Sequence, residues 1–205
     1  MKTLKILSSK PDCEIAMPYR SQGTYKPAWA KTQQTNAVEL SRVLPTSKKV
    51  AKYEDLDLYH HQDAPDVDFY FVHEGGLIQY GVRVIRYKLV GKLNKPTCGQ
   101  VSVWRNKLSP DTVGLPKWVS EKLLYSKYGC IISDKVQSED GENFWIHRIV
   151  DALKSGKSVS VLDIDEKHHT LEILDTQMIK STRDLKRYYT EGEDYSGEHF
   201  RFLIE

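Results

Sequence analysis

The sequence predicts a mixed α/β (α+β) protein with a mostly antiparallel central sheet flanked by helices. Two observations lead to this class. Residues 130–163 show a strand, a polar turn, a helix and a second strand in close succession, and residues 68–88 show two strand patterns joined by a glycine turn. Short β-α-β connections are typical of α/β sheets, whereas a tight hairpin pairs its strands antiparallel. We therefore expect both kinds of pairing in one sheet.

The clearest element is the β-α-β unit of residues 130–163. A short apolar run over 130–132 predicts the first strand, and the polar residues 135–141 cannot continue a buried strand. Residues 143–153 carry apolar side chains at helical spacing. Gly156 then stands where a helix often ends in a left-handed residue. Val159 and Val161 begin the second strand.

The hairpin and a third strand come before this unit. Residues 68–72 and 77–88 form the hairpin around the turn 73–76, with its Gly75-Gly76 pair. In the second strand apolar and basic residues alternate, which predicts one buried and one wet face. The apolar set is Ile85, Tyr87 and Leu89, and the basic set is Arg86, Lys88 and Lys92. Residues 99–105 are the third strand.

Further elements follow on both sides of the β-α-β unit. A helix is predicted from Leu115 to Gly129, with Pro116 in its first turn. After the unit, residues 170–174 alternate again and can pair back across the acidic turn 163–167. Residues 181–188 resemble a short charged helix, and residues 200–204 a last strand.

Residues 1–67 are expected to form an irregular, loop-rich excursion. Four prolines interrupt residues 11–52, and only residues 36–44 have the spacing of a short helix. Residues 53–68 are acidic and predict a solvated loop. No proline-, glycine- or serine-rich linker divides the chain, so we expect one domain over residues 1–205.

Composition excludes several classes of protein. The formal net charge of +2 and the pI near 8.3 do not by themselves indicate nucleic-acid binding. The three cysteines are odd in number and widely spaced, which favours reduced thiols and a cytoplasmic setting. No signal peptide or membrane span is predicted. The pairs His60-His61 and His168-His169 are poor metal chelators, because adjacent strand residues face opposite sides. No metal site is expected.

Two stretches carry a family resemblance. They are VSVWRNKLSPDTVGLPKWVSEKLL and CIISDKVQSEDGENFWIHRIVDAL. The first is similar to the central strand, loop and helix of GNAT-type N-acetyltransferases, and the second resembles the next strand and helix. The second also resembles GNAT-like proteins of tailed bacteriophages. The resemblance covers residues 68–163. It implies a GNAT-like fold and acetyl transfer from acetyl-CoA to an amine, in the host cytoplasm if the protein is phage-encoded.

The resemblance also implies where the cofactor would lie. The backbone of Val103, Trp104 and Arg105 would accept the pantetheine arm. Amide groups at Gly114 and Leu115 would face the pyrophosphate at a helix N-terminus, and Asn143 would reach the cofactor arm. Of the usual glycine-rich loop only Gly114 is present. The same loop has an acidic residue, Asp111, and a proline without an N–H group, Pro116.

Acetyl transfer needs a base for the amine and an acid for the leaving thiolate. Asp134, at the end of a strand, and His147, on the following helix, are the candidates for these roles. Each also has a structural interpretation: Asp134 as a cap or turn residue, and His147 as a half-exposed helix residue. Trp104 could line a cleft or pack under a helix.

Other functions stay open at this stage. A non-catalytic phage protein could use the same fold to bind a host protein or nucleic acid. Arg86, Lys88 and Lys92 would then form the nucleic-acid surface, or else a solvated strand face. A third hypothesis is group transfer onto a DNA base. The sequence does not determine the acceptor, the oligomeric state or the role of residues 11–67.

Overall fold

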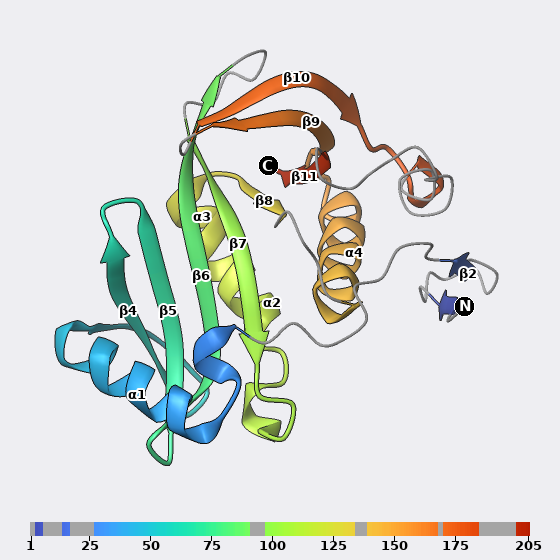
Figure 1. Cartoon of the computed structure of the whole chain (residues 1–205). Helices are drawn as coiled ribbons and strands as arrows, with labels where there is room; N and C mark the ends of the chain where they lie inside the picture. The colour runs from blue at the N-terminus through green and yellow to red at the C-terminus, as the bar shows by residue number, and fades with distance from the viewer. Residues whose placement is uncertain are drawn as a thin grey trace.

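The computed structural model describes residues 3–5, 14–16, 27–90, 97–133, 139–167, 170–184 and 200–205. Within them, nine strands form one sheet in the order β10-β9-β11-β8-β7-β6-β5-β4-β3 (Figure 1). These strands are β3 (Lys48–Tyr53), β4 (Leu56–Ala64), β5 (Val67–Glu74), β6 (Leu77–Val90), β7 (Thr97–Arg105), β8 (Ile131–Ser133), β9 (Val159–Lys167), β10 (Thr170–Met178) and β11 (Phe200–Ile204). A separate antiparallel pair joins β1 (Thr3–Lys5) to β2 (Glu14–Ala16). The predicted mixed class with a mostly antiparallel sheet is confirmed.

The sheet closes on itself at one end. Strands β3 to β7 form an antiparallel meander, while β7 with β8 and β6 with β10 are parallel pairs. Because β10 also pairs with β9, strands β6, β7, β8, β11, β9 and β10 form a hydrogen-bonded ring. The β9–β10 hairpin arches over the upper end of the sheet (Figure 1). Buried side chains of this ring pack in one apolar cluster: Tyr87, Leu89, Cys130, Ile132, Leu162, Ile164, Ile173 and Leu203.

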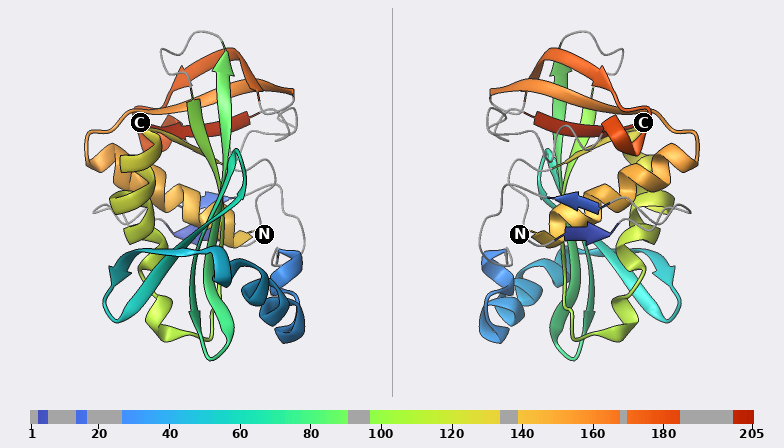
Figure 2. Two further views of the ribbon diagram at one scale, coloured as in Figure 1. Left: turned by 90° about the vertical axis from the view of Figure 1, so that its left-hand side faces the viewer. Right: turned by 90° about the vertical axis from the view of Figure 1, so that its right-hand side faces the viewer.

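Helices cover both faces of the sheet (Figure 2). On one face lie α4 (Glu139–Lys154) and a continuous helix made of α2 (Leu115–Val119), a π-helical turn (Ser120–Leu124) and α3 (Tyr125–Tyr128). The largest apolar core lies between these helices and the strands. On the other face α1 (Gln33–Val43) covers a smaller core, which includes Trp29, Phe69, Phe71 and Ile78. In the described part of the chain, three 3-10 turns lie outside these helices: Ala28–Ala30, Leu44–Thr46 and Pro110–Thr112.

Local signals explain the two best-defined helices. In α4, Trp145, Ile146 and Ile149 are buried, as their spacing predicts, and the helix begins four residues before the predicted start at residue 143. In α1, the Thr32 hydroxyl accepts a hydrogen bond from the Thr35 N–H, and the Thr35 hydroxyl accepts one from the Thr32 N–H. This reciprocal capping fixes the helix start.

The acidic segment over residues 53–68 is not a solvated loop, so that prediction was wrong. It contains the whole of β4 and the turns on either side, and β4 pairs with both β3 and β5. Leu58 is fully buried. The aspartates are matched by cations: Asp57 with Lys49, and Asp63 with Arg42 and Arg83. Once their charge is neutralised, the apolar alternation of Leu56 and Leu58 can direct the segment into the sheet.

Several other predictions are confirmed. The hairpin is β5–β6, the third strand is β7, and residues 170–174 pair back on β9 within the longer β10. On β6, Tyr87 and Leu89 are buried while Lys88 is exposed. Lys92, the pair His168-His169 and residues 185–188 lie outside the described residues, and residues 182–184 are helical.

Gly81 allows Trp29 to pack directly on the sheet. A Cβ atom at Gly81 would lie 2.9 Å from Cε2 of Phe69 and 3.0 Å from the Trp29 ring. We expect Gly81→Ala to lower the free energy of unfolding by about 1–3 kcal/mol, because overpacking forces these rings from their positions. Urea denaturation measures this change, with exposed Lys88→Ala on the same strand as the control. An unchanged Gly81→Ala midpoint would contradict this packing.

Candidate functional site

The predicted cofactor strand has one open edge. The parallel β7–β8 pairing runs from Gly99↔Ile131 to Val101↔Ser133 and stops there. β7 continues to Arg105 and pairs with β6 on its other side along this whole length. The β8 side of residues 102–105 therefore has no strand partner among the described residues. Backbone groups at such an edge are available to an extended ligand.

Side chains along this edge alternate between the two faces. Val103 packs against the core under the helices, whereas Trp104 packs on the opposite face. The ring centroids of Trp104 and Trp29 lie 4.9 Å apart, and the rings meet edge to face. Trp104 is therefore a packing residue on the α1 face, and only its backbone belongs to the open edge. Arg105 is half-buried at the end of the strand.

The N-terminus of α2 is covered by a tyrosine. Gly114 has a left-handed backbone (φ 82°) just before the helix, and Leu115 is fully buried. The Tyr53 hydroxyl donates to the Val113 carbonyl at 3.2 Å. It would lie 2.8 Å from a Cβ atom at Gly114. A phosphate approaching Gly114 would have to displace this hydroxyl, which the sequence did not predict.

Of the two acid–base candidates, His147 lies within the described residues and Asp134 does not. His147 is exposed on α4, and Asn143, one turn earlier, is half-buried on the same side of the helix. The opposite side of α4 carries the buried Ile146 and Ile149. Asp134 lies outside the described residues. Its neighbour Ser133 is buried, and its hydroxyl accepts a hydrogen bond from the Phe202 N–H at 3.0 Å.

A polar cluster that the sequence did not predict surrounds Asp68. Its side chain is only 4% exposed. His60 Nε2 lies 2.6 Å from Oδ1, and the Tyr128 hydroxyl donates to Oδ2 at 2.6 Å. Because an ionised carboxylate only accepts hydrogen bonds, Nε2 of His60 carries the hydrogen. Two cations lie further out, with Lys127 Nζ 3.5 Å from Oδ1 and Arg86 Nε 3.5 Å from Oδ2.

A chain of hydrogen bonds supports this carboxylate. Lys127 Nζ donates to the Tyr70 hydroxyl at 2.5 Å, and the Tyr70 and Tyr128 hydroxyls lie 3.1 Å apart. Since Tyr128 donates to Asp68, its oxygen accepts from Tyr70. Burial, followed by the hydrogen bond to Asp68, raises the pKa of Tyr128 and keeps the phenol protonated. Both phenols are therefore donors in a structural network.

The net effect on Asp68 is stabilisation of its charged form. Burial alone raises the pKa of the Asp68 carboxyl. The hydrogen bonds from Tyr128 and His60 and the charge of Lys127 lower it more, so the pKa lies below its ordinary value. One signal in the sequence could have indicated this cluster: Asp68 stands at a buried-face position of its strand, two residues before Tyr70.

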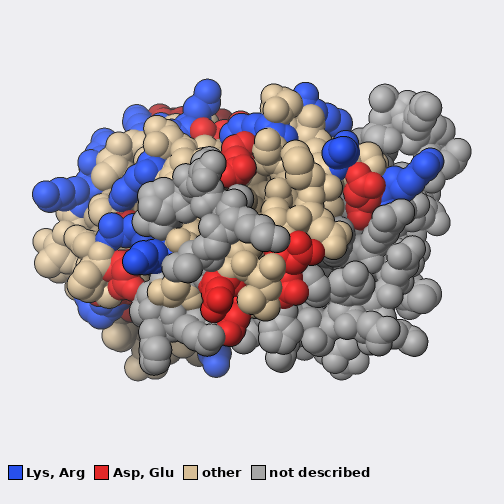
Figure 3. Space-filling model, turned by 90° about the horizontal axis from the view of Figure 1, so that it is seen from above, with Lys and Arg blue, Asp and Glu red and all other residues tan. Residues whose placement is uncertain are grey.

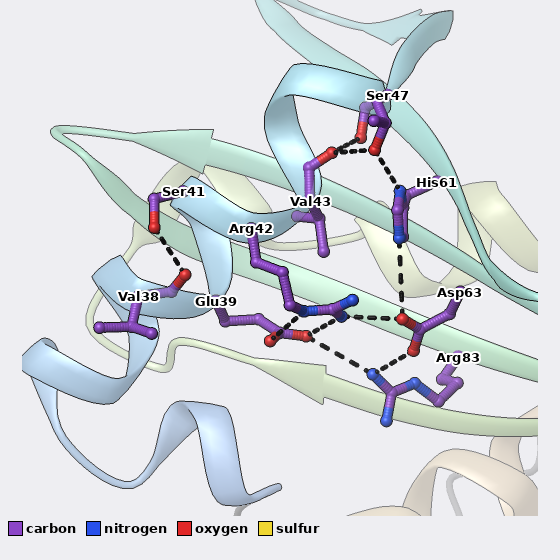
Figure 4. A network of polar contacts seen from close by, with 10 residues as sticks. Val38, Glu39, Ser41, Arg42, Val43, Ser47, His61, Asp63 and Arg83 are labelled. Carbon is purple, nitrogen blue, oxygen red and sulfur yellow. Dashed lines mark hydrogen bonds and ion pairs between the residues drawn. The ribbon is translucent and has the colours of Figure 1, made fainter.

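The adjacent His60 and His61 serve different clusters. His60 faces Asp68, while His61 faces Asp63 on the other face of β4, with Nε2 and Oδ1 3.7 Å apart. Figure 4 shows Asp63 at the centre of this second network, which joins α1, β4 and β6. Its other members are Arg42, Arg83 and Glu39. The predicted alternation of the histidines is confirmed, and the network ties α1 to the sheet.

No family model, curated protein or solved structure matches this chain. Among the described residues, no group of three or more His, Cys, Asp or Glu side chains is placed to hold a metal ion. No helix in the described part of the chain has both the length and the apolar character needed to cross a membrane.

Proposed function

We propose that the protein transfers an acyl group from an acyl-CoA thioester, with acetyl-CoA as the simplest donor, to an amine. The observation that carries this proposal is the open β7 edge at residues 102–105, beside the point where β8 ends. An extended chain with amide groups, such as a pantetheine arm, can pair with such an edge. An open edge on this strand is what the GNAT resemblance implies for the pantetheine arm.

The reaction would take place near the end of β8. The amine attacks the thioester carbonyl, a C–N bond forms, and the C–S bond breaks. The amine gives up a proton to a base, and the leaving thiolate takes one from an acid. Asp134, which follows Ser133, is our candidate base. His147 faces away from the sheet on α4, so we expect it to matter less.

Calorimetric titration with acetyl-CoA tests the proposal. Binding in the micromolar range, about −8 kcal/mol, would support it. Mass spectrometry of the purified protein would also detect coenzyme A that is retained through purification. Absence of binding up to millimolar acetyl-CoA would refute acyl transfer. Host-protein binding by a non-catalytic form of the fold would then be tested by pull-down.

A pair of glycine variants tests whether the acyl donor binds at the N-terminus of α2. Gly114 (φ 82°) and Gly156 (φ 72°) are both left-handed, so Gly156→Ala controls for backbone strain. A Cβ atom at Gly114 would also lie 2.8 Å from the Tyr53 hydroxyl, whereas one at Gly156 would meet nothing within 4 Å. We expect Gly114→Ala to weaken acetyl-CoA binding tenfold or more, about 1.4 kcal/mol, and Gly156→Ala to leave it unchanged. Equal effects would show that strain, and not the site, is responsible.

If the donor binds, a screen of acceptors completes the assignment. Free amines, protein lysines and the exocyclic amines of DNA bases cover the acceptor classes that the proposal allows. Asp134→Asn is expected to lower the rate at saturating acceptor at least a hundredfold, in the range of general-base catalysis, and His147→Gln is not.

A further inference from the structure

A group of basic side chains shares the helix-covered face of the sheet. Lys48 of β3 is the direct cross-strand neighbour of His60, so both point to the face where Asp68 lies. Arg86 and Lys88 are two residues apart on β6 and also share a face. Lys127 reaches the same place from α3. We call this group the basic patch: Lys48, His60, Arg86, Lys88 and Lys127.

The carboxylates near the patch neutralise it only in part, since Asp68 lies 3.5 Å from both Arg86 and Lys127. Asp68 is buried, and its oxygens already accept from His60 and Tyr128. Asp66 lies in the adjoining turn, where its carbonyl accepts from the Arg86 N–H. Glu172 of β10 pairs with Val90, at the end of the patch that lies beyond Lys88 on β6. The four permanent cations of the patch outnumber these three carboxylates of the described residues, and Asp68 is shielded from solvent.

The charged groups of the patch are accessible. Lys48 and Lys88 are exposed, and the Arg86 and Lys127 side chains are each 40% exposed. Figure 3, a view from above, shows Lys and Arg side chains over this end of the molecule, with Asp and Glu among them. The four cations of the patch are therefore open to solvent.

We infer that the basic patch binds the phosphate backbone of a polynucleotide. Exposed cations give a single small anion little binding energy in salt solution. A polyanion gains from several of them at once, because each contact releases condensed counterions. The Tyr70 and Tyr128 rings are occupied by Lys127, which lies 5.1 and 5.4 Å from their centroids. These two rings are therefore not available for stacking on bases. Contacts to phosphate alone carry no sequence information. The binding is sequence-independent.

The test compares two double variants that remove the same charge from different faces. Lys48→Gln with Lys88→Gln removes two exposed patch lysines. Lys49→Gln with Lys52→Gln removes two lysines from β3, whose cross-strand neighbours Tyr59 and Asp57 place them on the opposite face. Fluorescence anisotropy with a labelled duplex DNA, between about 50 and 200 mM salt, gives the affinity and its salt dependence.

The patch variant is expected to bind more weakly and to reduce the slope of log K against log salt by up to about 1.8, or 0.9 for each phosphate contact. The control should keep most of the wild-type slope. Equal losses in both variants, or no wild-type binding at low salt, would overturn the inference. Competition by inorganic phosphate beyond its effect on ionic strength would instead identify a small phosphate ligand and overturn the polynucleotide assignment.

A second variant tests the centre of the patch, and a second ligand separates this inference from acyl transfer. Arg86→Gln with Lys127→Gln should reduce the slope similarly, with thermal unfolding used to verify that the variant is folded. Acetyl-CoA binding should be unchanged in the Lys48/Lys88 variant. DNA binding and donor binding can therefore fail independently.

Discussion

Asp68→Asn is expected to lower the free energy of unfolding by about 2–3 kcal/mol at neutral pH. The carboxylate is buried and accepts hydrogen bonds from His60 and Tyr128, and the substitution removes the charge that orients both. Lys127 and Arg86 are exposed enough to be rehydrated, so their loss adds little. Urea denaturation at pH 7 measures the difference.

The same variant has a defined pH dependence. The folded-state pKa of Asp68 lies below its ordinary value of 3.8. Its contribution is therefore fully present above about pH 5 and is lost as the pH falls through the folded-state pKa. The difference in unfolding free energy between wild type and Asp68→Asn should stay constant from pH 7 to about 5 and shrink as the pH is lowered further, to about 3.

Asp55→Asn is the control for this measurement. Asp55 is fully exposed and lies 3.7 Å from Lys52 on the same hairpin. We expect it to leave stability unchanged at every pH. A difference between wild type and Asp68→Asn that stays constant with pH would show that the Asp68 pKa is not lowered by folding.

Asn36→Ala is expected to destabilise the protein by about 2–4 kcal/mol. The buried Asn36 amide donates from Nδ2 to the Ile78 carbonyl at 2.9 Å and accepts from the Ile78 N–H at 2.6 Å. It makes the two hydrogen bonds that a neighbouring strand would make. Alanine leaves both backbone groups of Ile78 buried and unpaired, at about 1–3 kcal/mol each before relaxation.

The exposed Val38 provides the matched control. It lies on the same helix, and Val38→Ala should change stability by less than about 0.5 kcal/mol. Thermal and urea unfolding of both variants measure the effect. If Asn36→Ala matches the control, the bond to Ile78 contributes nothing net. If Asn36→Gln keeps the wild-type stability, the amide group itself matters more than the length of the side chain that carries it.

Local patterns were enough to predict most of the elements. The Gly75-Gly76 turn predicted the β5–β6 hairpin, since both glycines adopt left-handed backbones that other residues resist. The spacing of Trp145, Ile146 and Ile149 predicted α4, and the alternation on β6 predicted its buried face. Each of these signals lies within a few neighbouring residues, so the chain itself carries it.

The acidic hairpin shows where local patterns fail. Residues 53–68 carry the charge of a solvated loop, and nothing within the segment shows that Asp63 meets Arg42 and Arg83. Those partners lie about 20 residues away on either side of Asp63. Charge composition therefore pointed to the wrong structure, because pairing across the sheet neutralises it.

The sequence by itself determined the mixed fold class, the order of most elements after residue 67 and the position of the unit formed by β8, α4 and β9. Only the tertiary structure decided the sites. Asp68 meets Tyr128 from 60 residues away, and Asn36 meets Ile78 from 42. The Tyr53 hydroxyl covers Gly114, and Lys48 of β3 is the cross-strand neighbour of His60 on β4. The physical reason is that periodicity shows which face a side chain takes, whereas its partner on that face is set by strand register and helix packing.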